Sequence, residues 1–354
     1  MSSVIVEVVE VEDVFPHTNA DKLCLARIKG WQTVIRKLED GSPQFAPGDR
    51  VVYIPPDSTL PREMAEKLGV VNYLSEKTNI SGDRELVVKQ VRLRGEPSYG
   101  FIIAPEDPGW EVGTDVREHY GIGKFMPPVR FDAGDAEPAH PAFQRYTDIE
   151  NLRNFPSTFE HGEEVVVTEK IHGTNARIGY VEGKLLAGSH GLQRKRPEPE
   201  KLATNTYWFP ATLPPVMSLL DDLSQRHRQV ILYGEIYGSR VQKLHYGQRA
   251  GLGFAAFDLY VDDHYLDYDE FKALCDRHGV ATVPVLGRGP YSLELIKSLS
   301  QGKTTLPDQH IREGVVVKPV KERLNPEIGR LVLKYLSDDY LLNAKLTAAD
   351  ATDM

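Results

Sequence analysis

The sequence has few cysteines and no long apolar run, and each absence excludes a class of protein. Its two cysteines, Cys24 and Cys275, are far apart and lie in apolar patterns, which predicts buried free thiols rather than a disulfide framework or a cysteine-rich zinc site. No apolar stretch approaches the ~20 residues that span a bilayer, and the N-terminus lacks the basic and apolar regions of a signal peptide. We therefore expect a soluble, cytoplasmic protein with no membrane partner.

Positive charge is also scarce. The net charge is −9, which argues against a protein that coats nucleic acid through bulk charge. Any polynucleotide would have to be bound locally, by clusters such as Arg194-Lys195-Arg196. The length of 354 residues, with 41% hydrophobic content, is enough for two packed cores.

Three motifs are excluded by their context. Gly302-Lys303-Thr304 resembles the end of a P-loop, but Lys297 stands where the motif requires its first glycine. The GLGFAA stretch at 251–256 fits a loose dinucleotide-binding fingerprint, yet a strand pattern follows it where a helix is required. The 11 histidines include no pair at a metal-ligand spacing that recurs with cysteine or carboxylate, so a catalytic zinc centre is not expected.

The first part of the chain is predicted to be a small β barrel. Residues 1–118 contain short β segments separated by glycine and proline, with one helix over about 61–68. The phrase HTNADKLCLARIKG at 17–30 resembles the opening of the OB-fold domains that bind tRNA in some synthetases and their accessory proteins. We therefore expect an all-β, OB-like domain that contacts nucleic acid.

A linker and an α+β domain are predicted to follow. Residues 119–150 are rich in proline, glycine and acidic residues without an apolar period, which is typical of a linker. Over 151–354, strand and helix patterns alternate, which indicates an α+β domain with mostly antiparallel sheets. One of its helices is expected to begin after Asp267, with Glu270 as its capping-box partner and Gly279 as its stop.

Five short stretches in this second domain carry the residues of a nucleotide site. They are EKIHGTN at 169–175, YGEIYG at 233–238, GFAAFDLY at 253–260, EGVVVKP at 313–319 and LVLKY at 331–335. The first places the amine of Lys170 three residues before Gly173, at the end of an apolar strand, where the backbone can turn tightly around a phosphate. The alternation of Asp258, Tyr260 and Asp262 predicts that alternate residues of the third stretch face opposite ways, with these three on its exposed face.

The first stretch resembles motif I of the ATP-dependent RNA ligases, a family of covalent nucleotidyltransferases, in the form typical of the RNA ligase 2 group. The other four resemble motifs III, IIIa, IV and V in the same order, so the resemblance spans about 150–340. An OB-like domain in front of such a domain is the arrangement of the RNA ligase 5 clade, whereas DNA ligases and capping enzymes carry it after motif V. Only 20 residues follow Lys334, too few for such a domain.

This resemblance implies an antiparallel-sheet adenylyltransferase domain that uses ATP and a divalent metal, Mg²⁺ or Mn²⁺. Lys170 would attack the α-phosphorus of ATP, expel pyrophosphate and hold AMP as a phosphoramidate. It must be neutral to do so, and nearby cations, Lys318, Lys334 and the metal, would lower its pKa from the ordinary value near ~10.4. AMP would pass to an RNA 5′-phosphate, and a 3′-hydroxyl would then displace it. The resemblance therefore implies an enzyme of RNA repair, and we expect the protein to be a monomer.

The resemblance also assigns the remaining roles. Among the nucleotide-binding residues, Glu169 would meet the adenine edge through its backbone or side chain, with Gly173 beside it. Glu235 would accept a hydrogen bond from the ribose, and Phe257 would stack on adenine, although an aromatic in such a strand is more often core. Lys170, Lys318 and Lys334 would contact the phosphates.

The metal and transfer roles fall on three further residues. Glu313 would bind the metal, with Asn175 directly or through water. His172 and Asn175 resemble positions that act in transfer of AMP to the RNA 5′-phosphate.

Two positions depart from the family pattern. Val332 stands where motif V of many relatives has its first lysine, which leaves Lys334 and, as a further candidate, Arg330. Where the RNA ligase 2 group has an arginine that engages the nick, this chain has Ser189-His190 and, further on, Arg194-Lys195-Arg196. Either His190 or the trio Arg194, Lys195 and Arg196 could contact the nucleic acid backbone.

Other functions stay open at this point. A DNA ligase or a capping-type nucleotidyltransferase would use the same lysine chemistry, and domain order argues against both. A non-catalytic OB-fold RNA-binding protein with a dead nucleotide pocket is the alternative from another class. Within the ligases, the substrate could be an RNA nick, a nick with RNA on one side only, or free ends.

Overall fold

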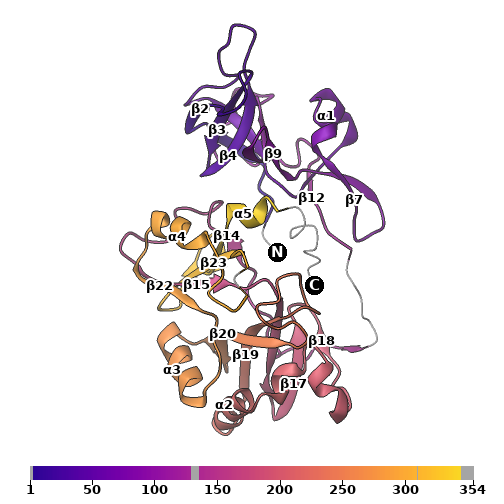
Figure 1. Cartoon of the computed structure of the whole chain (residues 1–354), viewed down its shortest axis with the longest axis vertical. Coiled ribbons are helices and arrows are strands. Elements are labelled where there is room, and N and C mark those ends of the chain that lie inside the picture. Colours follow the sequence, from indigo (N-terminus) through magenta and orange to yellow (C-terminus); the bar gives the residue numbers. More distant parts are fainter. Residues whose placement is uncertain (1–2, 129–134, 309, 344–354) are drawn as a thin grey trace. The chain divides into compact units, whose positions relative to one another are not determined.

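The computed structural model describes residues 3–128, 135–308 and 310–343, and the chain divides into two compact units (Figure 1). The first unit comprises residues 1–128 with 153–156, and the second comprises 129–152 with 157–354. Residues 129–134 of the predicted linker lie outside the described part of the chain. Among the described helices, none has the length and apolar character needed to cross a membrane.

The first unit consists mainly of short strands. They are β1 (Glu7–Glu10), β2 (Asp13–Pro16), β3 (Leu23–Ile28), β4 (Trp31–Arg36), β5 (Arg50–Ile54), β6 (Ser58–Leu60), β7 (Ser75–Thr78), β8 (Arg84–Val87), β9 (Gln90–Leu93), β10 (Glu96–Tyr99), β11 (Phe101–Ile103) and β12 (Gly123–Lys124). They form sheets in the orders β1-β5-β11, β2-β3-β4, β10-β9 and β12-β6-β8-β7. The predicted helix over 61–68 is α1 (Arg62–Lys67), followed by the 3-10 turn η1 (Val71–Tyr73).

Alternating valines build the core of the first unit. Val6, Val8, Val52 and Ile54 are fully buried, whereas Glu10 at the end of β1 is exposed. β-Branched side chains favour strands because they pack well on a pleated, half-buried surface. The predicted all-β character of this unit is therefore confirmed.

A short segment from the middle of the chain belongs to the first unit. The guanidinium carbon of Arg153 lies 4.3 Å from the ring centroid of Trp31 and 5.5 Å from that of Tyr99. The indole Nε1 of Trp31 donates a hydrogen bond to Oδ1 of Asn154 at 3.3 Å. Cation-π contacts of a buried arginine hold this segment on the barrel.

The second unit contains two larger sheets. Its strands are β13 (Ala136–Glu137), β14 (Glu150–Asn151), β15 (Glu164–Lys170), β16 (Thr174–Val181), β17 (Lys184–Ser189), β18 (Gln193–Arg194), β19 (Gln229–Tyr237), β20 (Gly253–Val261), β21 (His264–Tyr265), β22 (Val285–Pro290), β23 (Gly314–Pro319), β24 (Leu324–Asn325), β25 (Gly329–Arg330) and β26 (Leu333–Leu336). The large sheet has the order β13-β18-β17-β16-β19-β20-β21, and the small sheet has the order β14-β26-β23-β15-β22. Except for the parallel pair β14–β26, the strand pairs described in both sheets are antiparallel, as predicted.

Helices complete the second unit. They are η3 (Pro199–Thr204), η4 (Phe209–Thr212), α2 (Pro214–Ser224), α3 (Tyr268–His278), α4 (Leu293–Ser300) and α5 (Asp338–Leu341). Helices α2 and α3 lie side by side (Figure 1) and bury Leu219, Leu220 and Phe271 against Ile178 and Leu232 of the large sheet. This apolar face of the large sheet forms the main core, so its opposite face is the one that can carry polar groups.

The ends of α3 agree only in part with the sequence prediction. Gly279 takes the left-handed conformation at φ 73° and stops the helix, as predicted. Asp267 occupies the N-cap, but its side chain makes no cap hydrogen bond, so the predicted capping box with Glu270 is wrong. The carboxylate of Asp267 instead accepts a hydrogen bond from the backbone N–H of Glu322 at 2.7 Å, a partner from a distant loop.

Strand β20 differs from its prediction at one residue. Asp258 was expected on the exposed face of this strand, yet its exposure is 0%. The register between β19 and β20 shifts between Tyr233 and Gly234, which places Asp258 opposite Tyr233 on the polar face of the large sheet. Buried cationic partners there make its burial tolerable.

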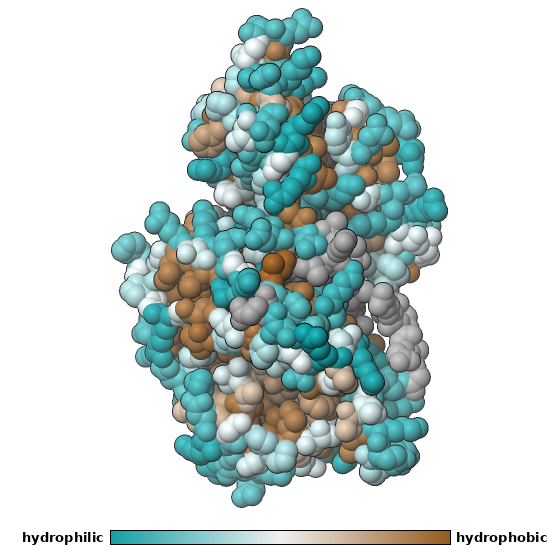
Figure 2. Space-filling view, in the orientation of Figure 1, coloured by the Kyte–Doolittle hydropathy of each residue, from teal (hydrophilic) through white to brown (hydrophobic). Residues whose placement is uncertain are grey.

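Two smaller features of the surface and core follow from the same structure. Both cysteines are buried and free, as predicted. Figure 2 shows apolar side chains gathered over α4 and β22, where Leu295 and Val285 are 46% and 43% exposed.

Candidate active site

Lys170 ends β15 and is paired with a buried carboxylate. Its Nζ lies 2.7 Å from Oε1 of Glu313, and the side chains of Lys170 and Glu313 are 25% and 5% exposed. Glu313 immediately precedes Gly314, which lies opposite Lys170 across the β15–β23 pair. A Cβ at Gly314 would come within 2.3 Å of the carbonyl oxygen of Tyr335, so only glycine lets β23 begin this close to β26.

The register of the small sheet brings the three predicted lysines onto one face. Gly314 pairs with Lys170, Val166 with Lys318, and Lys334 with Val316. Directly opposed residues share a face of an antiparallel sheet, and residues two apart on a strand share it too. Lys170, Lys318 and Lys334 therefore all point toward the same side of the small sheet.

The polar face of the large sheet supplies two further predicted residues. Asn175 lies directly opposite Glu235 across β16 and β19. Oδ1 of Asn175 is buried and accepts no hydrogen bond from any described residue. A buried amide oxygen without a donor is costly unless a ligand or water satisfies it.

Gly173 joins the two sheets at this point. Its backbone N–H donates a hydrogen bond to Oε1 of Glu235 at 3.1 Å. A Cβ at Gly173 would lie 2.2 Å from the carbonyl oxygen of Ile236, so a larger residue would push the turn after Lys170 away from β19. The glycine of motif I is therefore required by packing as well as by any ligand.

Glu235 is the carboxyl group most perturbed by this environment. Burial, together with the charge of Glu313, raises the pKa of Glu235 from 4.5 to about 7, against the opposing effects of Lys170 and the Gly173 N–H. In the free protein, the unfavourable free energy of burying the charge of Glu235 therefore exceeds the stabilisation that its neighbours provide.

This shift predicts a pH dependence of stability. A carboxyl whose pKa is raised on folding binds protons more tightly in the folded state, so its contribution is complete below about pH 4.5 and is lost as pH rises through about 7. Thermal melts of the wild type and of Glu235→Gln across this range are expected to diverge, with the wild type losing stability relative to the variant as pH rises. The exposed Glu39→Gln serves as control, and parallel curves for Glu235→Gln and wild type would contradict the assignment.

His172 lies beside the Lys170–Glu313 pair. Its Nδ1 is 3.4 Å from Oε2 of Glu313 and 3.3 Å from the hydroxyl of Tyr340. Its backbone N–H donates to the hydroxyl of Tyr246 at 2.8 Å. Burial raises the pKa of Glu313, but Lys170 and His172 outweigh it and hold that pKa below its usual value. Glu313 is therefore an anion in the free protein.

Glu169 is held by the protein through its side chain. Its carboxylate accepts hydrogen bonds from the hydroxyl of Thr304 and, at 2.9 and 2.7 Å, from the backbone N–H and hydroxyl of Thr305. The side chain is 0% exposed. Of the two routes to adenine that the sequence left open, the geometry favours the backbone of Glu169.

Lys318 belongs to a buried charge network centred on Asp258. Oδ1 of Asp258 lies 3.0 Å from Nζ of Lys318, and its Oδ2 accepts hydrogen bonds from Arg330 at 2.6 Å and from the Tyr146 hydroxyl at 2.8 Å. Glu322 adds a second carboxylate, 2.6 Å from Arg330 and 3.7 Å from Lys318. Burial raises the pKa of Asp258, but Arg330 and Lys318 outweigh it and lower that pKa.

Asp258, Tyr146 and Glu322 were not predicted as site residues. The one signal in the sequence was an aspartate inside the apolar run GFAAFDLY, since a buried carboxylate requires partners. The pattern could not identify those partners, because they come from other elements.

Phe257 and Lys334 are both partly exposed. Phe257 is half-buried, and its ring centroid is 4.8 Å from that of Tyr146 in an edge-on contact. Lys334 is half-buried, while Val332 is 1% exposed. Val332 therefore serves the core at the position where many relatives have a lysine.

The basic residues predicted to contact nucleic acid separate into two groups. Arg194 is buried, with its guanidinium 2.6 Å from Asp135 and stacked 4.8 Å from the ring centroid of Tyr207. This corrects the prediction for Arg194, because a buried and paired guanidinium cannot reach a polynucleotide. Lys195 and Arg196 are exposed.

His190 is partly covered. Its Nε2 lies 3.2 Å from Oδ1 of Asp148, and burial lowers the pKa of the imidazole, against the effect of Asp148. A neutral imidazole near the surface can still accept or donate a hydrogen bond, so His190 stays a candidate for contact with nucleic acid.

Comparison with known proteins agrees with this architecture. Residues 163–336 match the model of the RNA ligase family, and residues 5–105 match that of an OB-fold domain. No curated protein matches the sequence significantly. The predicted fold class, an antiparallel α+β ligase domain preceded by an OB-fold domain, is confirmed.

Several solved structures of an RNA ligase from Naegleria gruberi are similar over nearly the whole chain. A variant with ATP and Mn shows 25% identity and a TM-score of 0.75, covering 95% of this chain and 98% of that one. A variant with AMP and Mn shows 26% identity with the same TM-score and coverage. The structure with pyrophosphate shows 25% identity and a TM-score of 0.73, covering 96% of this chain and 98% of that one.

Proposed function

The chain is an ATP-dependent RNA ligase, and we propose that it seals 3′-hydroxyl and 5′-phosphate ends at nicks in RNA-containing duplexes. The observation that carries this proposal is the position of Lys170, whose amine ends a buried strand beside Glu313 and lies close enough to Glu235 for its charge to act on that carboxyl group. Asn175 lies opposite Glu235 in the other sheet. One amine, two carboxyl groups and an amide, contributed by two sheets, suit transfer of a nucleotide.

In the first step, Nζ of Lys170 forms a bond to the α-phosphorus of ATP, and the bond to pyrophosphate breaks. The amine must first lose a proton, whereas in the free protein it is ion-paired with Glu313. An adjacent anion favours the ammonium form, so this pair keeps Lys170 aimed but unreactive. A divalent cation held by Glu313 would compete with the amine for that carboxylate, so Lys170 would lose its counter-ion, could release its proton to solvent and would then be the neutral nucleophile.

Glu313 and Asn175 fit a divalent metal. A buried carboxylate and a buried amide oxygen without a hydrogen-bond donor are hard oxygen ligands of the kind that Mg²⁺ and Mn²⁺ prefer. When bound, such a metal offsets the charge that develops on the phosphates.

The remaining residues position the nucleotide. Lys318 and Lys334 share the face of Lys170 and would contact the phosphates, with Asp258 holding the Lys318 amine in place. Glu235 would bind the ribose, the backbone of Glu169 would meet the adenine edge, and Phe257 would stack on the ring.

Two further steps complete sealing. AMP passes from Lys170 to the RNA 5′-phosphate, with His172 and Asn175 beside the transferring group, and the N–P bond breaks as a new P–O–P bond forms. The 3′-hydroxyl then attacks that 5′-phosphorus and releases AMP. The OB-fold domain, with His190, Lys195 and Arg196 of the ligase domain, would hold the polynucleotide.

Matched substrates test this function directly. Wild-type protein with ATP and Mg²⁺ or Mn²⁺ is given four 5′-phosphorylated substrates: an all-RNA nick, a nick with RNA only on the 3′-hydroxyl side, an all-DNA nick and single-stranded RNA ends. We expect both RNA-containing nicks to be sealed at least ~10-fold faster than the other two. Single-stranded ends lack the duplex that holds both ends together, and the all-DNA nick lacks the 2′-hydroxyl by which a protein distinguishes RNA from DNA.

Other outcomes assign other functions. Equal sealing of the DNA nick would indicate a DNA ligase, and transfer of label from GTP rather than ATP would indicate a capping-type enzyme. Labelling from neither nucleotide, in protein free of bound AMP, would indicate a non-catalytic RNA-binding protein. Gel filtration and cell fractionation test the predicted monomeric state and cytoplasmic location.

A further inference from the structure

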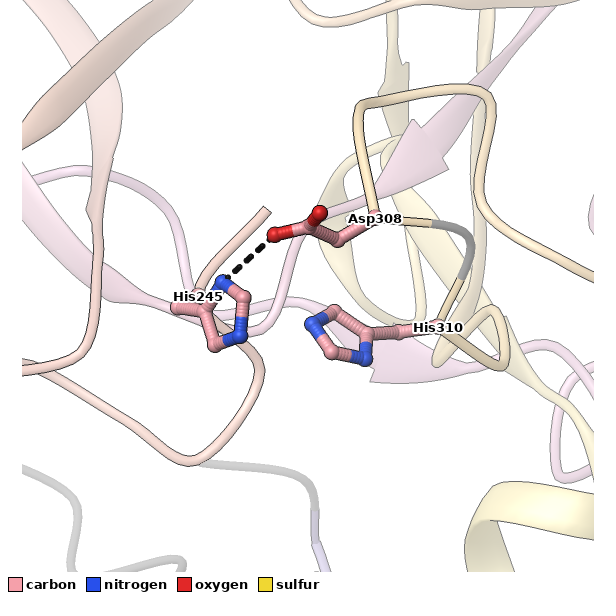
Figure 3. A group of neighbouring side chains, drawn as sticks. All are labelled: His245, Asp308 and His310. Atoms are coloured by element: carbon pink, nitrogen blue, oxygen red, sulfur yellow. Dashed lines mark ion pairs between the residues drawn. The ribbon is translucent and has the colours of Figure 1, made fainter. Parts of the chain in front are cut away.

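Two loops of the second unit bring together a carboxylate and two imidazoles outside the proposed nucleotide pocket. His245 lies in the loop between β19 and β20, and Asp308 and His310 lie in the loop between α4 and β23. One candidate ligand atom from each residue lies within 4.8 Å of the other two. Figure 3 shows the three side chains pointing toward one another.

The polar atoms of this cluster are incompletely satisfied. Nδ1 of His245 lies 3.1 Å from Oδ2 of Asp308, and the His245 and His310 rings meet edge-to-face with centroids 4.6 Å apart. Nε2 of His310 is buried and has no hydrogen-bond partner among the described residues.

We propose that His245, Asp308 and His310 bind a divalent transition metal of the zinc class in a structural site. Two imidazoles and one carboxylate are a ligand set that zinc accepts, with water in the fourth position. Zn–N and Zn–O bonds of ~2.0–2.1 Å place tetrahedral ligand atoms about 3.3 Å apart. Small side-chain rotations would close the present spacing to that value.

Arg249 is compatible with such a site. Its guanidinium contacts both oxygens of Asp308, at 3.3 and 3.4 Å, and its side chain is 75% exposed. An outer hydrogen-bond partner orients a ligating carboxylate, so Arg249 can hold one oxygen of Asp308 while the other binds the metal.

The position of the cluster indicates what the metal would do. Tyr246, next to His245, accepts the hydrogen bond from the N–H of His172, and the loop of Asp308 contains Thr304 and Thr305, which hold Glu169. The two loops also touch, since a Cβ at Gly247 would lie 2.9 Å from Cβ of Pro307. A metal here would fasten together the two loops that support the residues on either side of Lys170.

Metal binding to the full-length protein tests the site without reference to activity. Chelator-stripped protein in excess Mg²⁺ and without nucleotide is dialysed against Zn²⁺, or titrated with Co²⁺ while its visible spectrum is recorded. We expect one equivalent of Zn²⁺, a tetrahedral Co²⁺ spectrum and a rise in melting temperature. His245→Ala and His310→Ala are each expected to weaken binding more than ~100-fold, beyond the 10- to 100-fold effect of outer-sphere changes.

Two matched variants make the result specific. His264→Ala removes a histidine that also lies 3.1 Å from an aspartate, Asp263, but has no second imidazole nearby among the described residues, and it is expected to bind zinc normally. Glu313→Gln is also expected to retain the equivalent, which separates this site from the proposed catalytic metal.

Three results would overturn the proposal. They are no Zn²⁺ bound by the wild type, unchanged binding by His310→Ala, or loss of the equivalent in Glu313→Gln alone. If circular dichroism shows that His310→Ala does not fold, Asp308→Asn is tested instead. Asp308 is exposed, and asparagine is nearly isosteric with aspartate. Unchanged binding by Asp308→Asn would then count against the site.

Discussion

Replacing Lys170 by alanine is expected to abolish the transfer of AMP from ATP to the protein. The alanine methyl cannot form a bond to phosphorus, and no other described lysine has been placed beside both Glu313 and the motif I turn. Removal of a covalent nucleophile leaves only positioning and electrostatics, so labelling should fall by roughly 10⁴-fold or more. The measurement is acid-labile label from α-labelled ATP on the denatured chain, with the exposed Lys184→Ala as control.

The same variant separates the chemical steps. Because AMP is already attached to the 5′-phosphate in a pre-adenylylated RNA nick, Lys170→Ala should still seal that substrate while failing on ATP and an ordinary nick. Label that persists in the variant would place the nucleophile elsewhere. Loss of sealing on the pre-adenylylated nick would show that Lys170 also acts after adenylylation.

Local patterns predicted the parts of the site that lie within single strands. The apolar run before Lys170, Gly173 and the order of the motifs were sufficient to name Lys170 and Glu313 as candidates, but their contact with each other is known only from the structure. Gly173 and Gly314 prove to be required by backbone contacts of 2.2–2.3 Å, a packing reason that agrees with the functional one. The lysines of three strands share a face because antiparallel register, once set by the apolar alternation, leaves no other choice.

Contacts between distant elements were not predictable in this way. The burial of Asp258 depends on a register shift and on a lysine and an arginine from other strands. Arg194 is buried by Asp135 and Tyr207, which no spacing rule connects to it. The cluster of His245 with Asp308 and His310 joins two loops, and for that reason the histidine spacing, which argued against a catalytic zinc centre, could not reveal it.

Replacing Asp258 by alanine is expected to cause the largest loss of stability of any single change considered. Its carboxylate is the shared partner of Lys318, Arg330 and the Tyr146 hydroxyl, all of them buried. Removing one side of a buried ion pair costs about 3–5 kcal/mol, because the remaining charge stays out of water. Glu322 is the other carboxylate that contacts this network among the described residues, and it can compensate only in part.

Urea titration followed by hydrogen exchange in β20 and β23 would measure this loss where it arises, in the strands that carry Asp258 and Lys318. Asp263→Ala is the control, since its side chain is 93% exposed, and it should change stability by less than ~0.5 kcal/mol. A similar small change for Asp258→Ala would contradict the buried network. A double-mutant cycle with Lys318→Met isolates the pairwise term, which is expected to be favourable.

The pH dependence of the Asp258→Ala effect gives an independent check with the opposite sign to that of Glu235. The folded-state pKa of Asp258 lies below its ordinary value of 3.8, so its contribution is present above that value and is lost as pH falls through the folded pKa. The stability difference between wild type and variant should therefore be constant near neutral pH and shrink only in strong acid. Because Asp258 also holds the amine of Lys318, Asp258→Ala should slow adenylylation under conditions where the variant remains folded. The double variant with Lys318→Met should then adenylylate no more slowly than Lys318→Met alone.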